Sequence, residues 1–483
     1  MSGKINIQRL HYKIPATPER KLARFFWPGQ ANANRIIKTV LNFDEKTVEQ
    51  ELQKVRNLFE KNHINFTEIL EEHFENLSQQ ASIDTSVDTK RKWLLGAHFT
   101  MEYAFECAAL FNPSMIPAHN QQGVDNGYLR FIMSLRAVGE GHVSSIVFRR
   151  GLIGPDGNIT VNPPRLRVRQ VKMTHDTSYD KKIFRRKLEQ MNITGPIVEE
   201  ILVELPNIFT DPELTELLAR KRQDRKKDSE FERIANVMSW LSRSDYRVKF
   251  DDIDQIEEMI LFPISESESQ GIEDMRLVAF TDENGESIVY GTYTAFNGRS
   301  ILPQLIEVRT DGIGHVQTLH GKCAQNKGMA LFPEKFDGKY YMIGRIDGTN
   351  LFLMKSDDVC IWNDAEIIYT PTYLWETIQV GNCGSPLKTD AGWLLITHGV
   401  GPMRRYCIGA ILLDLKDPSK VIGTLKEPLL EPIEGESSGY VPNVVYSCGG
   451  LIHNGNLVLP YGISDTATGF AIIKLDELLS VMK

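Results

Sequence analysis

Hydrophobic positions in the first hundred residues recur at helical intervals. Between residues 44 and 77, Glu and Lys fill many positions around an apolar series spaced by three and four residues, namely Val48, Leu52, Val55 and Leu58. Such spacing predicts an amphipathic helix, and Asn42 or Asp44 can cap its start. Residues 90–110 are largely apolar and contain no proline, and no glycine after Gly96, so they predict a second helix. We therefore expect a helical N-terminal extension over residues 1–104.

Past Pro113 the pattern changes from helical to strand-like. Residues 128–138 and 143–153 are short runs rich in β-branched and aromatic side chains, and the turn sequences GEGH and GPDGN separate and close them. This arrangement is typical of a β-meander. Residues 178–243 return to helical patterns. The basic run at 220–227 within them is interpreted as a solvated helix face, with contact to nucleic acid as the alternative.

From about residue 247 onward, strand patterns dominate. Strand candidates include MRLVAFT, SIVYGTYTAF, KYYMIGRI, LFLMKS, GWLLITHGV, CIGAILLDL, NLVLPYGI and FAIIKL, with turn sequences such as DENG, FDG and HNG between them. Many short strands with regular turns predict a sandwich, a barrel or a propeller. Blocks such as FDGKYYMIGR and TDAGWLLITHG look like copies of one degenerate repeat of about 40–60 residues, which favours a propeller. A propeller gathers polar loop ends around a central funnel, where a sugar can bind.

Composition and charge exclude some classes of protein. The 483 residues are 42% hydrophobic and 24% charged, and the formal net charge is −8. A general nucleic-acid binder carries a basic surface, so this class is not expected, although a local cluster of Lys and Arg can still hold an anion. Six cysteines are scattered without a C-x-x-C pair. This pattern argues against a zinc ribbon or a disulfide framework and predicts reduced thiols.

The sequence contains no sign of export or membrane insertion. The N-terminus lacks the apolar core of a signal peptide, and no stretch approaches about 18 uninterrupted apolar residues. We therefore expect a cytoplasmic protein without a membrane partner.

The first candidate for chemistry is the sequence GIEDMR at residues 271–276, at the start of a strand. Two adjacent carboxylates, Glu273 and Asp274, precede Arg276. An arginine at this distance keeps one carboxylate ionised, while burial raises the pKa of the other, and the result is an acid held in a fixed position. The alternative is an ordinary ion pair on a loop.

Two cations bracket a strand–turn–strand unit at residues 326–345. If residues 329–333 pair with 340–344, Lys327 and Arg345 lie at the same end of the hairpin and converge on one anion. Arginine suits bidentate recognition of phosphate. The alternative is an exposed hairpin without a ligand.

Further polar candidates lie in the C-terminal part of the chain. In residues 381–400, glycines relax the backbone so that a ligand can approach closely. Lys388 would supply a third cation, and His398 a polar group at a strand end. Asp465, at a strand-to-turn junction, can hydrogen-bond vicinal hydroxyls. The alternatives are a structural histidine and a routine Asx turn.

Taken in order, these blocks resemble a known family. The sequences IEDMR, KGMALFPEKFDGKYYMIGR, GNCGSPLKTDAGWLLITHGV, LLDLKDPSKVIG, VPNVV and YGISDT are together similar to glycoside hydrolase family 130. That family contains inverting β-mannoside phosphorylases and some β-1,2-mannosidases on a five-bladed β-propeller. The resemblance extends over about residues 105–483, so we expect a mainly β catalytic domain there, interrupted by a helical insertion at about 178–243. The N-terminal extension and the insertion resemble a longer subgroup of the family.

The resemblance implies roles for individual residues. The family's acidic motif is Glu-Asp-Pro-Arg, with Met275 here in the proline position, and its catalytic acid falls on Asp274. Its phosphate-holding basic residues fall on Lys327, Arg345 and Lys388, with Lys327 in place of a frequent arginine. The other residues expected to bind substrate are Asp465, Arg136, His142, Asn112, Glu273, Arg276 and His398.

Inverting chemistry needs one acid and an external nucleophile on the opposite face of the sugar. Phosphate is already anionic and needs cations to hold it, whereas water needs a carboxylate base. The cations named above favour phosphate, and the carboxylates that would serve water are Glu376, Glu273 and Glu334. We therefore predict phosphorolysis of a β-mannoside to α-mannose 1-phosphate, with Asp274 protonating the leaving oxygen, directly or through a sugar hydroxyl.

Two other functions are compatible with the sequence. One is an inverting β-mannosidase that uses water, and the other is a non-catalytic propeller that binds glycan or protein through its funnel or its N-terminal helices. The expected partners are a mannose-containing oligosaccharide and inorganic phosphate as co-substrate, without nucleic acid. No metal or other cofactor is expected, because no His, Cys and Asp cluster has ligand spacing. The sequence does not decide the linkage, the acceptor sugar, or whether the chain forms a homo-oligomer.

Overall fold

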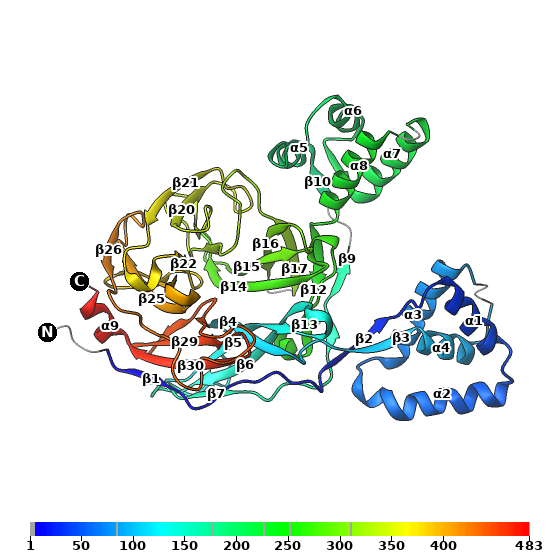
Figure 1. Ribbon diagram of the computed structural model, residues 1–483, viewed down its shortest axis with the longest axis horizontal. Coiled ribbons are helices and arrows are strands. Elements are labelled where there is room, and N and C mark those ends of the chain that lie inside the picture. Colours follow the sequence, from blue (N-terminus) through cyan, green and yellow to red (C-terminus); the bar gives the residue numbers. More distant parts are fainter. Residues whose placement is uncertain are drawn as a thin grey trace.

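β-Sheets form the body of the molecule. The computed structural model describes residues 5–83, 86–174, 178–225, 228–250, 253–309 and 312–482. Figure 1 shows the sheets with two groups of helices beside them, α1–α4 and α5–α8. A mainly β protein with helices near the N-terminus and in an insertion is thereby confirmed.

The longest sheet consists of two antiparallel meanders. The first contains β4 (Ala109–Pro117), β5 (Leu129–Val138) and β6 (Ser144–Ile153), with β7 (Ile159–Val161), β8 (Arg169–Gln170) and β13 (Met259–Leu261) at its edge. The second runs in the order β14 (Gly271–Thr281), β15 (Ser287–Phe296), β16 (Ile301–Val308), β17 (Ile313–Thr318), β12 (Tyr246–Lys249) and β9 (Lys172–Thr174). A parallel pair, Ser144 with Gly271, joins β6 to β14. The GIEDMR motif at the start of β14 therefore lies beside the start of β6.

Three smaller sheets follow along the chain. One contains β18 (Ala330–Leu331), β19 (Tyr340–Gly344), β20 (Leu351–Ser356) and β21 (Asp364–Tyr369). The next contains β22 (Gln379–Asn382), β23 (Leu387–Thr389), β24 (Gly392–Val400), β25 (Tyr406–Leu413) and β26 (Val421–Thr424). The last contains β27 (Val445–Tyr446), β28 (Leu451–His453), β29 (Asn456–Ile463) and β30 (Ala467–Lys474), and helix α9 (Leu475–Val481) follows it. Short 3-10 helices lie at Glu60–Asn62, Glu140–His142 (η2), Ile253–Glu258, Glu266–Glu268, Leu374–Glu376 (η5) and Pro402–Arg404 (η6).

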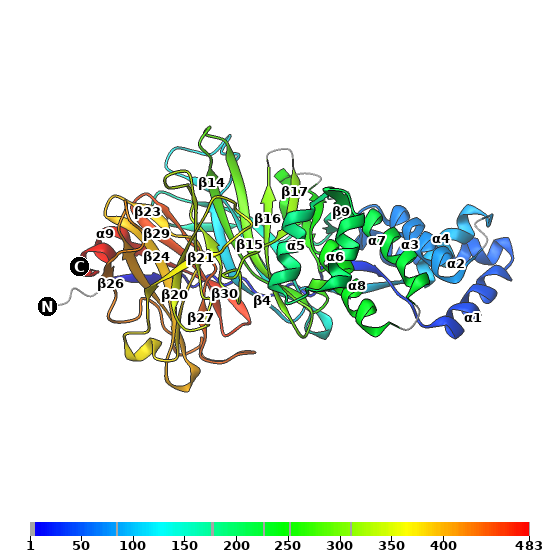
Figure 2. The same ribbon diagram turned by 90° about the horizontal axis from the view of Figure 1, so that it is seen from above.

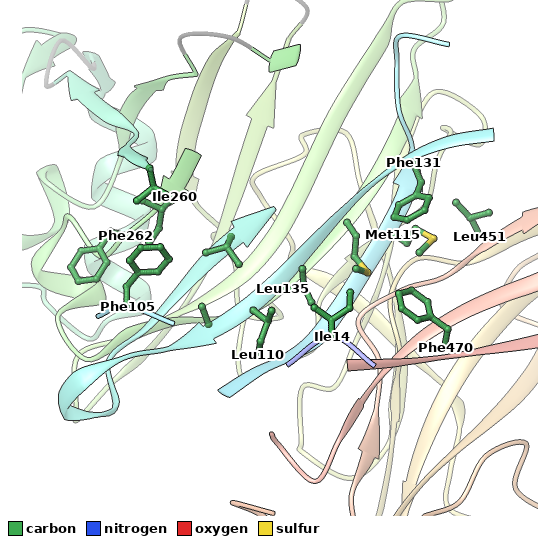
Figure 3. Close-up of a cluster of buried hydrophobic side chains, with 14 of the residues drawn as sticks. Ile14, Phe105, Leu110, Met115, Phe131, Leu135, Ile260, Phe262, Leu451 and Phe470 are labelled. Carbon is green, nitrogen blue, oxygen red and sulfur yellow. The ribbon is translucent and has the colours of Figure 1, made fainter. Parts of the chain in front are cut away.

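The N-terminal segment completes the last sheet. Strand β1 (Ile7–Arg9) pairs antiparallel with β30, so that Ile7 lies opposite Ile473, and Ile14 forms a bridge with Thr468. The buried Ile14 side chain belongs to a hydrophobic cluster drawn in Figure 3, together with Phe470, Leu451, Met115 and Phe131. Residues 7–14 therefore belong to the sheets, although they lie inside the extension that we expected to be helical.

Four helices form the rest of the N-terminal extension. They are α1 (Gln30–Leu41), α2 (Glu45–Phe59), α3 (Phe66–Ala81) and α4 (Thr89–His98), and a ribbon of β2 (Lys21–Phe25) and β3 (Thr100–Ala104) connects them to the sheets. Figures 1 and 2 place them at one end of the long axis. Asp44 caps α2 by accepting a hydrogen bond from the Thr47 amide at 2.7 Å, as one of the two predicted caps requires.

The helix predicted for residues 90–110 is wrong beyond His98. The chain there forms β3 and then β4, whose residues 109–116 are all buried. Apolar residues dominate this stretch, and periodicity alone does not separate a short apolar strand from a helical segment.

The helical insertion has a hydrophobic core of its own. It contains β10 (Ser178–Asp180), α5 (Lys181–Gln190), α6 (Pro196–Glu204), β11 (Ile208–Thr210), α7 (Asp211–Asp224) and α8 (Ser229–Ser242). The core residues all lie between Tyr179 and Leu241, and Figure 1 shows the helices projecting from the sheets near β9 and β12.

The cations of the basic run pair with carboxylates of the same insertion, through the contacts Arg220–Glu204, Lys221–Glu200, Arg222–Glu232 and Arg225–Glu200. These pairs support the interpretation as a solvated helix face. Lys226 and Lys227 lie outside the described residues.

Within the described ranges, no helix combines the length and the hydrophobicity needed to cross a lipid bilayer. The six cysteines are free thiols, and five of them are buried.

Candidate active site

Two β-bulges place an amide and a carboxylate side by side. The strand registers shift in β4 around Asn112 and in β14 around Asp274, and both residues adopt left-handed backbone, with φ values of 50° and 54°. This conformation costs a non-glycine residue about 1 kcal/mol, and bulges of this kind re-aim side chains next to active sites. The Asn112 Nδ2 donates a hydrogen bond to Asp274 Oδ1 at 2.7 Å.

Cations from three parts of the chain surround this acidic pair. Arg136, near the end of β5, contacts Glu273 through Nη2 at 2.8 Å and Asp274 through Nη1 at 3.4 Å. Lys327, in the loop before β18, donates to Glu273 Oε2 at 2.5 Å. Arg276 turns back on its own strand and donates to the backbone carbonyl of Asp274 at 2.9 Å. The structure thus brings Asn112, Arg136, Glu273, Asp274, Arg276 and Lys327 together.

The electrostatics of Asp274 differ from the sequence expectation. Burial pushes the pKa of Asp274 up, but Arg136, Arg276, the Asn112 hydrogen bond and Lys327 outweigh it, so the pKa lies below its usual value. The Asp274 carboxyl is therefore ionised at neutral pH in the free protein. We expected burial to raise the pKa of one carboxyl in the Glu273–Asp274 pair. Close to Asp274, the carboxyl with a raised pKa instead belongs to a residue outside this pair, on another sheet.

That carboxyl belongs to Asp465. It lies in the turn between β29 and β30 with a left-handed φ of 52°. Burial and the negative charge of Asp274 raise the pKa of Asp465 to about 6, against the opposing effects of Arg136 and Arg404. Asp465 and Asp274 thus come from different sheets and act on the same Arg136 guanidinium.

The hairpin predicted around Lys327 and Arg345 is confirmed. Ala330 pairs with Ile343 and Leu331 with Met342, so the two cations flank the same end of the β18–β19 hairpin. Lys327 points to Glu273, as described above. The Arg345 Nη1 donates to His398 Nε2 at 3.2 Å.

His398 is a neutral acceptor within this cluster. It is buried in β24, and burial together with the charges of Arg345 and Arg276 holds its pKa well below the usual range. Gly381 lies opposite it in β22, and any side chain at that position would collide with the imidazole ring. The glycine therefore makes room for the ring that orients Arg345.

Several buried polar atoms near Arg276 and Arg345 have no hydrogen-bond partner among the described residues. Among the described residues these atoms include Arg345 Nε, Arg276 Nε and Asn382 Oδ1. Asn382 is fully buried in β22, and a Cβ built on Gly328 would lie 3.4 Å from its Oδ1 and 4.0 Å from Arg276 Nη2. Buried polar groups are normally hydrogen-bonded, so this part of the cluster is suited to a polar ligand.

Two of the expected residues, Lys388 and Glu334, lie apart from the cluster. Lys388 is in β23, where it bonds Glu334 at 2.7 and 2.9 Å and lies over the Trp393 ring. Trp393, the residue paired with Lys388, precedes His398 by five positions in β24, which is about 17 Å of strand. The structure therefore does not bring Lys388 to Lys327 and Arg345. Because Glu334 is ion-paired with Lys388, it also lies away from the cluster.

The other carboxylate considered as a base is committed to local structure. Glu376, in η5, accepts hydrogen bonds from the Tyr369 hydroxyl at 2.8 Å and from the Thr372 and Tyr373 amides at 3.2 and 3.0 Å. Burial raises its pKa. These contacts make Glu376 the cap of its own turn.

A cavity of about 610 Å³ lies against the opposite face of β14, with Met275 and Leu277 in its wall. Their side chains alternate along the strand with those of Asp274 and Arg276. None of the described candidate residues lines this cavity, so the chemistry is assigned to the polar cluster on the other face.

The sequence analysis missed Tyr446 and Asn382. The Tyr446 hydroxyl accepts a hydrogen bond from Arg276 Nη2 at 2.6 Å, and Asn382 is described above. Tyr446 ends β27 and Asn382 ends β22. Whether a polar side chain at a strand end faces inward depends on how the sheets pack, which the local sequence does not record.

A family model described as β-1,4-mannooligosaccharide phosphorylase matches residues 241–483, about half of the chain. The chain belongs to glycoside hydrolase family 130. The match contains Asp274, Lys327, Arg345, His398 and Asp465, whereas the first candidate residues, Asn112, Arg136 and His142, precede it. We expected the resemblance to begin near residue 105, so the matched region is shorter at its N-terminal side.

Relatives within the family are named as phosphorylases. The chain is 36% identical over 257 residues to a 1,2-β-oligomannan phosphorylase of Thermoanaerobacter sp. strain X514. This match covers 50% of this chain and 82% of the relative. It is 31% identical over 170 residues to a β-1,4-mannooligosaccharide phosphorylase of Ruminococcus albus, covering 33% and 51%. Among solved structures, the β-1,2-mannobiose phosphorylase of Listeria innocua with β-1,2-mannobiose aligns with a TM-score of 0.45 and 20% identity, covering 78% of this chain and 92% of that one.

Proposed function

We propose that this chain phosphorolyses β-mannosides with inversion, releasing α-mannose 1-phosphate. The observation that carries the proposal is the cluster of cations beside one carboxylate, with Arg136, Arg276 and Lys327 around Asp274. Arg345 adjoins this cluster through His398, on which the charges of Arg276 and Asp274 also act. An anionic nucleophile needs such charge, and an inverting enzyme needs a single acid opposite it.

Phosphate is proposed to bind between Lys327, Arg345 and His398. Arg345 is held by His398 through one Nη, and its buried Nε has no partner among the described residues. A guanidinium with free N–H groups matches the oxygens of phosphate. Lys327 is anchored by Glu273 and can supply a second positive charge. Lys388 is left out of this proposal because it lies on a distant part of β24's sheet.

Phosphate binding is also proposed to prepare the acid. In the free protein the neighbouring cations keep Asp274 ionised. A bound phosphate compensates their charge, so the pKa of Asp274 rises and the carboxyl can take up a proton. A phosphate oxygen then forms a bond to the anomeric carbon while the glycosidic C–O bond breaks. The Asp274 proton moves to the leaving oxygen, directly or through a sugar hydroxyl.

The geometry favours phosphorolysis over hydrolysis. Water would need a free carboxylate as base, but Glu376 accepts three hydrogen bonds in its own turn and Glu334 pairs with Lys388. Glu273 is close enough to the cluster, yet it is ion-paired with both Arg136 and Lys327. A carboxylate neutralised by two cations is a poor base.

The first substrates to test are β-1,2-linked mannooligosaccharides. Relatives at 36% and 37% identity are named for β-1,2-linked mannan and mannobiose, whereas the matched family description and the Ruminococcus relative name β-1,4 linkages. We propose the β-1,2 linkage on the basis of the longer matches. We also propose a cytoplasmic location, which the six free cysteines support.

For the fold, we propose a five-bladed propeller. The longest sheet divides at the Ser144–Gly271 junction into two meanders, and these two with the three smaller sheets make five successive units. The pairing of β1 with β30 then joins both ends of the chain in the last blade, which supports the proposal.

The test measures mannose and α-mannose 1-phosphate released from β-1,2- and β-1,4-mannobiose, with and without inorganic phosphate. We expect turnover only with phosphate, and Asp274→Asn should lower kcat about 100- to 10,000-fold because the proton donor is lost. The control is Asp357→Asn, at a carboxylate whose side chain is 85% exposed. Equal mannose release without phosphate would establish the mannosidase instead, and substrate binding without turnover would favour a glycan-binding protein.

A further inference from the structure

Two aromatic rings lie exposed beside the candidate active site. The ring of His142, in η2 between β5 and β6, stacks on the ring of Tyr440 with centroids 5.5 Å apart and planes inclined by 26°. Tyr440 is 68% exposed, and His142 is also exposed, with a left-handed φ of 61°. A strained, exposed aromatic pair needs an explanation beyond packing.

The pair is anchored next to Asp465. The Tyr440 amide donates to Thr466 Oγ1 at 3.3 Å, and the Val441 amide donates to the Ser464 carbonyl at 3.2 Å. These contacts hold the Tyr440 loop against the β29–β30 turn that carries Asp465. On the other side, η2 follows β5 directly, and β5 carries Arg136. The stack thus bridges two sheets at the end where Asp274 and Asp465 lie.

A second exposed element borders the same turn. Met403 and Arg404, in η6 between β24 and β25, have consecutive left-handed φ values of 60° and 55°, and Met403 is 93% exposed. The charge of Arg404 acts on Asp465. The adjoining strand β25 meets the Tyr440 loop, because the Tyr406 amide donates to the Asn443 carbonyl at 3.0 Å. Exposed side chains therefore flank Asp465 from two directions.

We propose that the His142–Tyr440 stack binds the sugars of the leaving group, as an aromatic platform for β-linked mannosyl residues. This inference rests on the proposed function. Aromatic faces pack against the C–H faces of sugar rings and add affinity beyond buried area. The proposed phosphate residues Arg345 and His398 are more deeply placed, and His398 is buried. The terminal mannosyl ring sits at this buried end, so the rest of the oligosaccharide leaves toward solvent, where the platform lies.

The platform is tested in the direction of synthesis, with α-mannose 1-phosphate as donor and β-1,2-mannobiose as acceptor. Tyr440→Ala should raise the acceptor KM about tenfold and leave kcat and the donor KM within about twofold. Tyr440→Phe, which keeps the ring, should restore the wild-type acceptor KM. Tyr128→Ala is the matched control, because Tyr128 is 44% exposed in the loop between β4 and β5. An acceptor KM unchanged by Tyr440→Ala would overturn the platform.

Calorimetric titration with β-1,2-mannotriose, without phosphate, separates this inference from the proposed function. Weaker binding by Tyr440→Ala than by the wild type supports the platform even if the wild type has no phosphorolytic activity. Equal binding by both proteins, or no binding by the wild type, rejects the platform. If the wild type phosphorolyses β-mannosides and the Tyr440→Ala variant has the same acceptor KM and affinity, the proposed function stands and only the platform is rejected.

Discussion

Asp465 holds a negative charge where its surroundings disfavour one. Burial and Asp274 raise its pKa from 3.8 to about 6, so the folded chain binds this proton more tightly than the unfolded chain. The stability that the protonated carboxyl contributes is full below about pH 4 and is lost as the pH rises through about 6. At neutral pH the ionised Asp465 therefore lowers the free energy of unfolding.

Asp465→Asn should increase stability at pH 7.5 by up to about 3 kcal/mol, the equivalent of a shift of about two pKa units, because the amide resembles the protonated acid. The gain should shrink as the pH falls from 7 to 4. Urea denaturation at several pH values measures this, with the exposed Asp357→Asn as control. A gain that does not depend on pH would show that the charge is not its cause.

At the scale of single residues, the sequence correctly predicted that Lys327 and Arg345 lie at the same end of one hairpin. Of these two cations, Lys327 contacts the acidic motif, through Glu273. The ionisation states were not predictable. The pKa of Asp274 depends on Arg136, which precedes it by 138 positions, and the raised pKa belongs to Asp465 on another sheet. Burial and charge from distant segments determine these values, and no local pattern records them.

At the scale of elements, hairpin register explains which cations meet. The β18–β19 pairing puts Lys327 and Arg345 at the same end of one hairpin. Lys388 lies in β23 of another sheet and forms an ion pair with Glu334. Strands with turn residues on both sides were predicted to within a few residues, as for β15, β20 and β24. The segment after His98 was not, because a short, largely apolar stretch is compatible with either a strand or a helix.

Lys327→Met should raise the KM for phosphate about 10- to 100-fold, the effect of losing one charge-assisted contact, while the KM for the mannoside changes little. Lys388→Met is the matched control and should leave both values near those of the wild type, since Lys388 is 56% exposed and its ion pair within the described part of the chain is with Glu334. Initial rates at varied phosphate measure both. Equal effects of the two variants would contradict the assignment.

At the scale of the whole molecule, the N-terminal strand ties the chain into a single body. Ile14 is 6% exposed in the cluster that joins the first and last sheets. The pairing of residues 7–14 with β30 could not be predicted from the sequence, because strand pairing between distant segments leaves no local signal. The helices of the extension begin only after this segment has crossed the sheets, as Figure 1 shows.

Ile14→Ala should lower the free energy of unfolding by about 2–4 kcal/mol, the usual cost of truncating a buried isoleucine, with kcat unchanged at temperatures where the variant is folded. Lys13→Ala, at the exposed neighbouring position, is the control. Urea denaturation followed by tryptophan fluorescence gives both values. A loss below about 0.5 kcal/mol would mean that the segment does not secure the last sheet.

The pairing of Ile7 with Ile473 also orders events during synthesis. A ribosome adds about 5–20 residues each second, so β1 emerges roughly half a minute to a minute and a half before its partner. Throughout that interval the nascent chain carries a strand with an open edge, and the last sheet is completed only once β30 has been synthesised. Chaperone protection of residues 7–14 during that interval should therefore affect the yield of this protein.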